Sequence, residues 1–449
     1  MFNAQHGFLG RLSRTRQKQD NCKKKNGIFE YRIKHSILKF ETFIARRIVA
    51  TKSYKSSISA PIIKIAIAAI SLGIVMMMIS MATGVGLQQK IRQKIAAFHG
   101  QISIATYDNN LSEVSVNPIQ RDLVIESFPI QIEGIDHIQG VATKAGIIKT
   151  KESFEGIILK GVDTQYRWNT FEEYLVAGKI PKIQDSIASR EVLVSEFIAN
   201  RLLLEVGDRF KTFFMKNDAT AVPSQRTFVV SGIYTSGFPE FDATYILGDI
   251  QHIRTMNQWE ANTYGNYEVF VSDFDSLEDL TQTLYQQTPS TLDVQNISEK
   301  FYDIFSWLAL FDMNILIIIV IMILVGGVNM ITALLVLILE RTQMIGVLTV
   351  LGSSQWSIQK VFLYNAAYLI LIGLFWGNLI GLSLLYLQQT TGIIGLDPST
   401  YYVSEVPVDI NFMSIIVLNV GTLFFCMLML LIPSYIITKI APIKVLRFQ

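Results

Sequence analysis

Four long stretches of the chain contain no charged residue, and each is long enough to cross a membrane. Residues 65–89, 313–339, 361–396 and 410–438 carry no Asp, Glu, Lys or Arg. A membrane-spanning helix needs about 20 apolar residues, and a charge at its centre costs roughly 2.5–3.5 kcal/mol on the insertion scale. The pattern therefore predicts a polytopic α-helical membrane protein with four transmembrane helices, rather than a soluble protein with four core helices. We place these helices at 61–86, 311–339, 361–387 and 412–438.

The segment between the first two helices, residues 87–303, has the mixed pattern of a large α+β extracytoplasmic domain. Short runs rich in β-branched residues predict strands. They lie at 102–104, 156–159, 192–194, 227–230 and 268–271. Periodic segments such as 195–204 alternate with these runs and predict helices. The first transmembrane helix is expected to continue through 87–98 and to end at His99 and Gly100.

The distribution of charge predicts the orientation in the membrane. Residues 1–57 contain 14 Lys or Arg and three acids, a net charge of +11 in a chain whose total is +2. Basic residues near transmembrane ends stay in the cytoplasm, so the N-terminus is predicted to be cytoplasmic. Four crossings return the C-terminus, residues 439–449, to the same side. The loop at 388–411 carries acids and no base and is predicted outside, whereas the loop at 340–358 is predicted inside.

Two segments of different character precede the first transmembrane helix. Residues 1–27 are polar and basic, which predicts a disordered cytoplasmic tail. In 28–58, apolar residues recur every three or four positions with bases between them. This pattern predicts an amphipathic helix that lies in the inner membrane interface. A helix packed on a partner protein would have the same pattern, so both interpretations stay open.

The sequence contains no catalytic, cofactor-binding or metal-binding pattern. The phosphate-binding pattern G-x-x-x-x-G-K-[ST] does not occur, so the chain has no ATPase motif of that kind. The five histidines show no metal-ligand spacing, and no G-x-S-x-G nucleophile motif is present. The two cysteines, Cys22 and Cys426, both lie outside the predicted soluble domain. We therefore predict a membrane protein that is not itself an enzyme and binds no cofactor of its own.

Two stretches have a distinctive sequence pattern. The first, within 231–242, contains Ser236, Gly237, Glu240 and Asp242. The second, in the predicted inside loop, contains Glu340, Arg341, Ile345, Gly346, Leu348, Leu351 and Gly352. Both resemble the lipoprotein-releasing ABC transporter permeases of the LolC/LolE type, within the wider FtsX-like and MacB-like superfamily. The resemblance covers residues 41–449, although Met344 and Thr349 depart from the family pattern.

The resemblance implies a permease subunit that releases lipoproteins from the bacterial inner (plasma) membrane toward the outer membrane by mechanotransmission. ATP and Mg would act through a separate cytoplasmic ABC ATPase of the LolD type. The implied partners also include a second permease copy or homologue, the lipoprotein cargo, a periplasmic carrier and membrane lipids, but no nucleic acid. Two alternatives remain open, an FtsX-like regulator of cell-wall hydrolases and a MacB-like efflux permease.

Two sets of candidate site residues follow. In the family, the inside loop is a coupling helix that binds in a groove of the ATPase. The resemblance therefore implies this role for the loop at 340–358, with Glu340, Arg341, Ile345, Gly346, Leu348, Leu351 and Gly352 as the candidate residues. Apolar residues of the first two helices are candidates for a cargo cavity, because flexible Met side chains accept varied apolar shapes. They are Met76, Met77, Met81, Ile318, Met322 and Val325. Each could equally face lipid or another helix.

Overall fold

The computed structural model describes residues 59–151, 153–185, 187–215 and 222–435. These residues form two compact units. The membrane unit contains the described residues up to Ala82, then Asn314–Leu387, then those from Ile410 onward. The soluble unit contains Thr83–Met313 and Gln388–Asp409. The predictions for 1–27, 28–58 and 439–449 lie outside the described residues.

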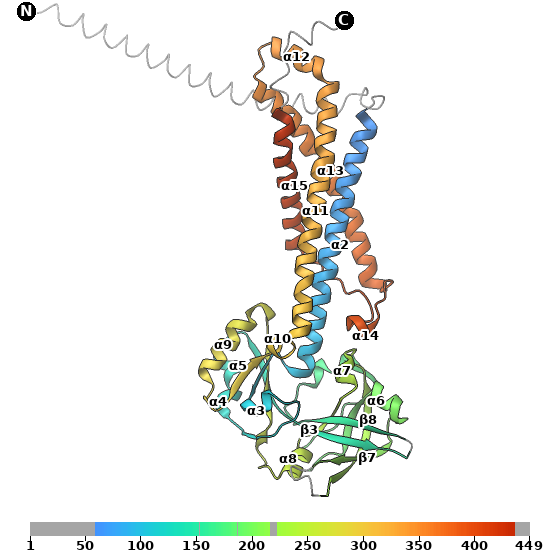
Figure 1. The fold of residues 1–449 in the computed structure, drawn as a ribbon, viewed down its shortest axis with the longest axis vertical. Helices are drawn as coiled ribbons and strands as arrows, with labels where there is room; N and C mark the ends of the chain where they lie inside the picture. The colour runs from blue at the N-terminus through green and yellow to red at the C-terminus, as the bar shows by residue number, and fades with distance from the viewer. Residues whose placement is uncertain (1–58, 152, 186, 216–221, 436–449) are drawn as a thin grey trace, which may run out of the picture. The chain divides into compact units, whose positions relative to one another are not determined.

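Four helices of the described chain are long and apolar enough to cross a membrane, which confirms the predicted fold class. They are α2 (Ser59–His99), α11 (Tyr302–Glu340), α13 (Gln355–Thr391) and α15 (Phe412–Ser434), all labelled in Figure 1. At about 1.5 Å per residue, the 41 residues of α2 span about 60 Å. A bilayer core is only about 30 Å thick, so α2 is much longer than a crossing requires.

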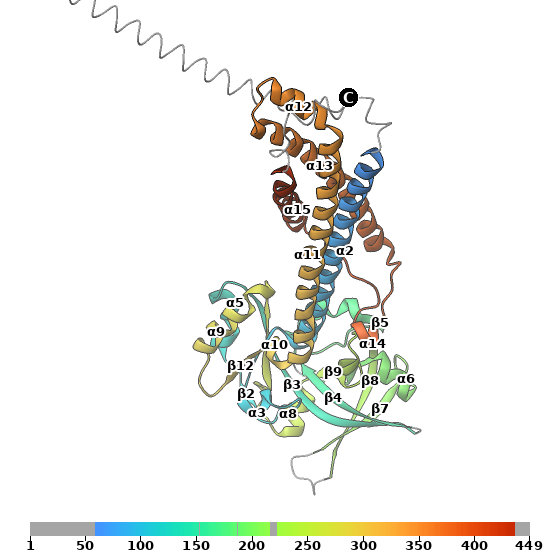
Figure 2. The ribbon, with the colours of Figure 1, turned by 45° about the horizontal axis from the view of Figure 1, so that its top comes forward.

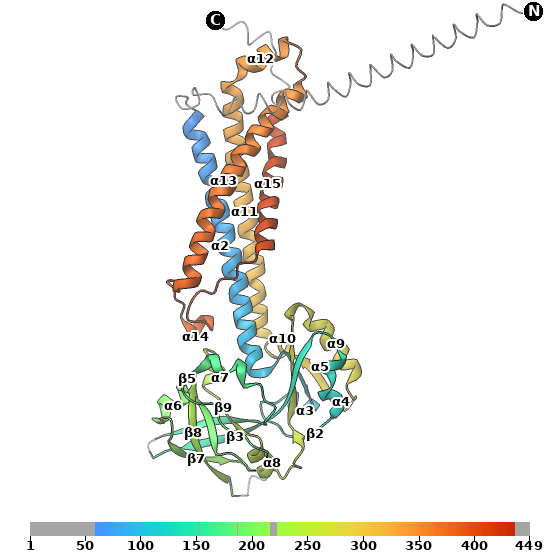
Figure 3. The same ribbon diagram turned by 180° about the vertical axis from the view of Figure 1, so that it is seen from behind.

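Glycines bring α13 into close contact with α2 inside the membrane unit. A Cβ atom added at Gly373 would lie 2.8 Å from Ile70, and one at Gly377 would lie 2.8 Å from Ile74. Figure 3 shows the two helices beside each other. Small residues at four-residue spacing let helix backbones approach in this way. Asn378 of α13 and Asn419 of α15 exchange amide hydrogen bonds of 2.7 and 2.9 Å.

The soluble unit is built on a ten-stranded sheet in the order β12-β1-β11-β3-β4-β9-β6-β8-β5, with β7 paired to β3 and β8. Figure 2 shows β3, β4, β7 and β8 lying side by side. The strands of the soluble unit are β1 (Ile102–Ala105), β2 (Ile119–Gln120), β3 (Ile135–Lys149), β4 (Phe154–Val162), β5 (Leu175–Gly178), β6 (Glu191–Ser195), β7 (Arg209–Phe214), β8 (Ser224–Tyr234), β9 (Tyr245–Asp249), β10 (Thr263–Tyr264), β11 (Asn266–Val271) and β12 (Asp293–Asn296). β2 and β10 form a separate pair. Most neighbours are antiparallel, but β4 with β9 and β6 with β8 are parallel.

Short helices surround the sheet of the soluble unit. They are α3 (Tyr107–Asn110), α4 (Leu123–Glu126), α5 (Phe128–Gln131), α6 (Glu196–Leu202), α7 (Pro239–Asp242), α8 (Gln251–Asn257), α9 (Leu277–Gln287), α10 (Ile297–Lys300) and α14 (Pro398–Tyr401). The membrane unit adds α12 (Thr342–Val350). Ser195 begins α6, because its hydroxyl accepts a hydrogen bond from the Ile198 amide at 3.1 Å.

The two longest helices enter neighbouring strands of the sheet. α2 ends at His99, and Gly100, at φ +68°, turns the chain into β1. β12 leads through α10 into α11 and pairs antiparallel with β1, with Ile102 opposite Asn296. Asn296 also forms a capping box with Glu299 at the start of α10. The exit from α2 and the entry to α11 are therefore joined by backbone hydrogen bonds.

Candidate functional site at the end of helix α2

The end of α2 is enclosed by aromatic side chains of the soluble unit. The Phe98 ring lies 4.2 Å from the ring of Phe241 and 4.8 Å from that of Phe171. The next residue, His99, has its ring 5.0 Å from Phe301 and 5.5 Å, edge-on, from Phe241. Aromatic pairs at such distances contribute about 0.5–1.5 kcal/mol each beyond their buried area. The helix end is therefore held inside the fold of the soluble unit.

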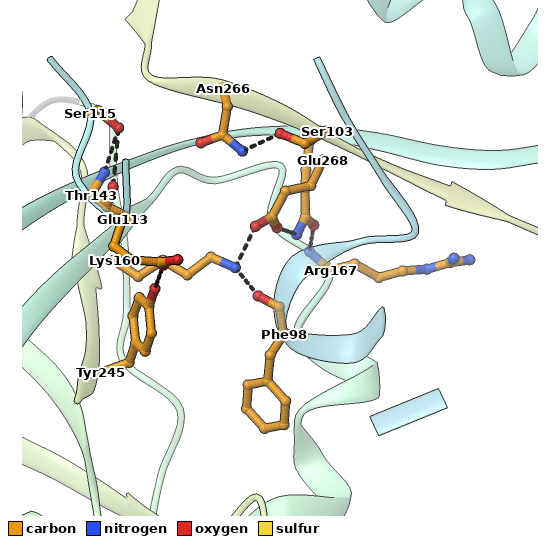
Figure 4. Close-up of polar contacts among 11 residues, drawn as sticks. Phe98, Ser103, Glu113, Ser115, Thr143, Lys160, Arg167, Tyr245, Asn266 and Glu268 are labelled. Atoms are coloured by element: carbon orange, nitrogen blue, oxygen red, sulfur yellow. Dashed lines mark hydrogen bonds and ion pairs between the residues drawn. The ribbon is translucent and has the colours of Figure 1, made fainter. Parts of the chain in front are cut away.

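A buried ion pair lies under the same helix end. The Lys160 ammonium on β4 is 2.6 Å from a carboxylate oxygen of Glu268 on β11, and it also donates a hydrogen bond to the carbonyl of Phe98 (Figure 4). The other Glu268 oxygen accepts a bond from the Gln139 amide at 2.9 Å. Burial lowers the pKa of Lys160, and the charge of Glu268 opposes this shift.

The distinctive stretch around Ser236 forms a tight loop that leads into α7. The Asp242 carboxylate accepts hydrogen bonds from the backbone amides of Ser236 (2.9 Å) and Gly237 (3.1 Å). Burial raises the pKa of Asp242, while these hydrogen bonds and the charge of Lys94 act in the opposite direction. Of the four predicted residues, Ser236, Gly237 and Asp242 thus come together, whereas Glu240 is exposed on α7.

This loop also contacts α2 and the segment between α13 and α15. The Lys94 ammonium of α2 donates a hydrogen bond of 2.9 Å to the carbonyl of Tyr402. The Tyr402 ring stacks on that of Phe238 at 4.7 Å. Gly237 has φ +68°, and a Cβ atom there would lie 2.7 Å from the Lys94 nitrogen. Only glycine combines this backbone conformation with so close an approach. Lys94 was not singled out by the sequence, because its partner is a backbone atom 308 positions away.

Within the soluble unit, α2 and α11 are also bonded to each other. The Gln88 amide donates to the carbonyl of Leu308 at 2.9 Å and to the carboxylate of Asp312 at 3.0 Å. Both Gln88 and Leu308 are buried. The two helices leave the soluble unit as a bonded pair, in addition to the pairing of the strands that follow and precede them.

The predicted coupling residues form a helix in the membrane unit that is shorter than the whole loop. Glu340 ends α11, and α12 runs from Thr342 to Val350 after Arg341 at its N-cap. Their burial is mixed: Ile345 and Gly346 are buried, Leu348 is half-buried, and Leu351 is 76% exposed. Gly352, at φ +89°, ends the turn after the helix.

The candidate cargo residues lie in different environments. Met77 is 1% exposed and belongs to the interior of the membrane unit. Met76 and Val325 are 43% and 46% exposed. Met81, Ile318 and Met322 are half-buried. The six residues therefore do not form one uniform surface, and their proposed role stays a prediction.

In the part of the chain that the structure describes, no group of three or more His, Cys, Asp or Glu side chains lies close enough together to hold a metal ion. The site consists of packing, hydrogen bonds and ion pairs between the end of a long helix and a sheet. Such an arrangement holds and positions chain segments. Together with the four membrane helices, it belongs to a membrane protein that carries a large α+β domain between its first two membrane helices.

Comparison with known families agrees with this class. The chain belongs to the family of the MacB-like periplasmic core domain, whose model matches residues 65–299. The model of the FtsX-like permease C-terminal domain matches residues 316–442. Together these matches identify a permease of the ABC-transporter type, as the residues around Ser236 and Glu340 predicted.

Curated relatives match over nearly their whole length. The lipoprotein-releasing system transmembrane protein LolC of Xylella fastidiosa (strain 9a5c) is 20% identical, with 85% of this chain and 92% of the relative covered. LolC of Neisseria meningitidis serogroup B is 20% identical, with 91% and 99% covered. LolE of Haemophilus influenzae is 22% identical, with 87% and 95% covered.

Two solved structures also align with the chain. The extracellular domain of the noncanonic ABC-type transporter YknZ from Gram-positive bacteria matches at 16% identity and a TM-score of 0.30, covering 44% of this chain and all of that one. The periplasmic region of MacB from Actinobacillus actinomycetemcomitans matches at 15% identity and a TM-score of 0.30, covering 44% and 88%.

Proposed function

We propose that this chain is the permease subunit of an ABC transporter that releases lipoproteins from the bacterial inner membrane. In this proposal both termini are cytoplasmic, the soluble unit is periplasmic, and a separate cytoplasmic ATPase hydrolyses ATP. The names of the relatives and their nearly complete coverage support the choice of cargo. A second permease subunit, identical or homologous, completes the assembly.

The observation that carries the mechanism is the continuity of α2 and its fixed end. One helix runs from Ser59 to His99 without interruption, from the membrane unit into the soluble unit. Its last turn is held by Lys160, and its neighbour α11 is bonded to it through Gln88. A continuous helix transmits displacement along its axis, because bending it or breaking its hydrogen bonds costs free energy. Movement of the membrane helices would therefore reach the sheet.

Release of a lipoprotein requires an external energy source. Exposing acyl chains to water costs about 0.8 kcal/mol per CH₂ group, so one chain of about 15 methylenes costs about 12 kcal/mol. Spontaneous exchange against such a barrier is slow. ATP binding can supply this energy only through a difference in affinity for two conformations of the permease.

The link to the ATPase is assigned to α12. Val347 and Val350 of α12, and Leu351 directly after it, are 51%, 62% and 76% exposed. An apolar helical face at a cytoplasmic loop fits the helix-in-groove mode of recognition. In this proposal, ATP-driven movement of the ATPase groove shifts α12, and with it α11 and α13 on either side.

Depletion of the chain in its host tests the function directly. Outer-membrane lipoproteins should then accumulate in the inner membrane, as measured by fractionation and labelling with acyl-chain probes. Purification in mild detergent should recover a cytoplasmic ATPase and bound lipoprotein. If lipoproteins still reach the outer membrane while cell-wall cleavage fails, the FtsX-like alternative replaces this proposal. Accumulation of exported small molecules, with normal lipoprotein sorting, would support the MacB-like alternative.

A further inference from the structure

Lys160 is a buried charge in a position where an apolar residue would suit the core. Its side chain is 2% exposed, and its neighbours on β4, Leu159 and Val162, are fully buried. Burying an ion pair has a desolvation cost of several kcal/mol per ion in real proteins, and apolar replacement of such a pair is often neutral or stabilising. Stability alone therefore gives little reason for a lysine here, so the second contact of its ammonium, besides the one with Glu268, becomes informative.

That second contact is with the backbone of α2. The Lys160 ammonium donates to the carbonyl of Phe98, the penultimate residue of the helix. The last four carbonyls of a helix have no partner within the helix and carry the negative end of its dipole. A positive donor at this point is therefore favourable. Glu268 holds the ammonium in place from β11, at 2.6 Å.

The network extends over three strands of the sheet. Glu268 on β11 lies opposite Gln139 on β3 in the strand register and bonds to its amide at 2.9 Å. The side-chain oxygen Oε1 of Gln139 then accepts a hydrogen bond from the Arg167 backbone amide at 3.1 Å. Figure 4 shows the Lys160 ammonium between the Glu268 carboxylate and the Phe98 carbonyl. One side chain thus joins the end of α2 to β4 directly, and to β11 and β3 through Glu268.

We propose that Lys160 is a positioning residue of the transport cycle, which fixes the last turn of α2 to β4 and β11. Helix ends open readily because their final carbonyls lack partners. Without this bond, a pull along α2 would be absorbed by opening of the last turn. With it, the pull moves the sheet. The inference rests on the proposed function, since it assigns to Lys160 a part in the coupling that release requires.

Paired substitutions separate this role from simple stabilisation. Lys160→Met leaves the Glu268 charge buried without a partner and is expected to be unstable. Lys160→Met with Glu268→Gln removes both charges and keeps a bonding partner for Gln139, so the double variant should fold. Glu268→Gln alone leaves the Lys160 charge buried without its carboxylate and is expected to be unstable as well. Lys144→Met is the matched control, because Lys144 lies on β3 and bonds to Asn257 of α8 at 2.6 Å.

The full complex with its ATPase is reconstituted in proteoliposomes, with a fluorescent triacylated lipopeptide as the probe. Two quantities are measured: lipopeptide released per ATP hydrolysed, and hydrogen exchange of the amides of residues 96–101. For the double variant we expect release per ATP to fall at least tenfold and exchange at 96–101 to rise at least tenfold. Lys144→Met should keep both values near those of the wild type.

Three results would overturn the proposal. Wild-type release and exchange in the double variant would show that the bond to Phe98 is dispensable. If Lys160→Met lowers lipopeptide release and the double variant restores release to the wild-type value, the pair serves only to balance its own charges. Loss of release with normal exchange at 96–101 would place the defect elsewhere. If the wild type releases no lipopeptide, the proposed function fails, and the exchange measurement still decides whether Lys160 holds the helix end.

Discussion

Replacing Gly237 with alanine perturbs the contact between α2, the Ser236 loop and the loop that carries Tyr402. Gly237 has φ +68°, and the new Cβ atom would lie 2.7 Å from the Lys94 nitrogen. The left-handed conformation costs a non-glycine residue about 1–2 kcal/mol. We expect the ammonium, at the end of the flexible Lys94 side chain, to move away and to lose its 2.9 Å hydrogen bond to Tyr402. A hydrogen bond that involves a charged group contributes about 1.5–3 kcal/mol.

The expected loss is therefore about 2.5–5 kcal/mol in the free energy of unfolding of the soluble unit. For a domain of about 150–250 residues this lowers Tm by about 5–20 °C, at about 2–4 °C per kcal/mol. The assay is thermal unfolding of the full chain in detergent, followed by tryptophan fluorescence. Trp168 and Trp259, which both pack against the core of the soluble unit, report on its unfolding.

Gly207→Ala is the control, because it separates the backbone cost from the contact. Gly207 has φ +99°, but a Cβ atom there would have no neighbour within 4 Å. It should therefore lose only about 1–2 kcal/mol. Combining Gly237→Ala with Lys94→Met should cost less than the sum of the two single changes, since both remove the same bond. Equal losses at Gly237 and Gly207, or strict additivity with Lys94→Met, would refute the reasoning.

Three further predictions concern separate parts of the chain. Because burial raises the pKa of Asp242, the folded protein keeps this carboxyl protonated at pH values where the unfolded chain has already ionised it. This difference lowers the Tm of the wild type as the pH rises, and Asp242→Asn should remove that fall. Wild-type stability should thus decrease as the pH rises from the ordinary pKa of Asp to the raised one and stay level above it; parallel curves would contradict this. Gly377→Leu should separate α13 from α2, costing about 1–3 kcal/mol by overpacking, and its Tm should fall well below that of Gly421→Leu, which has open space. Val350→Asp with Leu351→Asp should abolish co-purification of the ATPase, whereas Gln343→Asp, at another exposed position, should not; normal recovery in the double variant would exclude α12 as the docking helix.

Patterns of neighbouring residues were sufficient to predict the positions of the membrane helices and of many strands. The uncharged windows identified α2, α11, α13 and α15 because the length of a membrane span is a local property of the sequence. The predicted strands at 102–104, 156–159, 192–194, 227–230 and 268–271 all lie within strands of the sheet. The prediction that the first helix continues to His99 is also confirmed. The order of the strands was not predicted, because pairing joins segments far apart in the chain.

The candidate site was predicted only in part, since its contacts are also distant in sequence. Lys160 and Glu268 are 108 positions apart. Residues 158–163 resemble the family's short strand that ends in a glycine turn, but this resemblance gives Lys160 no partner. One local signal was present: each is a single charge within a short run of apolar residues that reads as a strand with both faces buried. A strand of that kind has no solvent side on which to place a charge. A charge in such a strand must be paired inside the core, which indicates a buried ion pair without saying which two strands supply it.

In the inside loop, the spacing of apolar residues predicted the helix but not which of its side chains are buried. Ile345, Leu348 and Leu351 recur at three-residue intervals, which predicts one apolar face on a helix. The structure ends α12 at Val350, buries Ile345 and leaves Leu351 exposed. Periodicity identifies the residues that avoid water, but it does not say whether the chain itself or a partner covers them. The burial of each side chain separates these cases, and it assigns Ile345 to the fold and Leu351 to the surface that the proposed ATPase would contact.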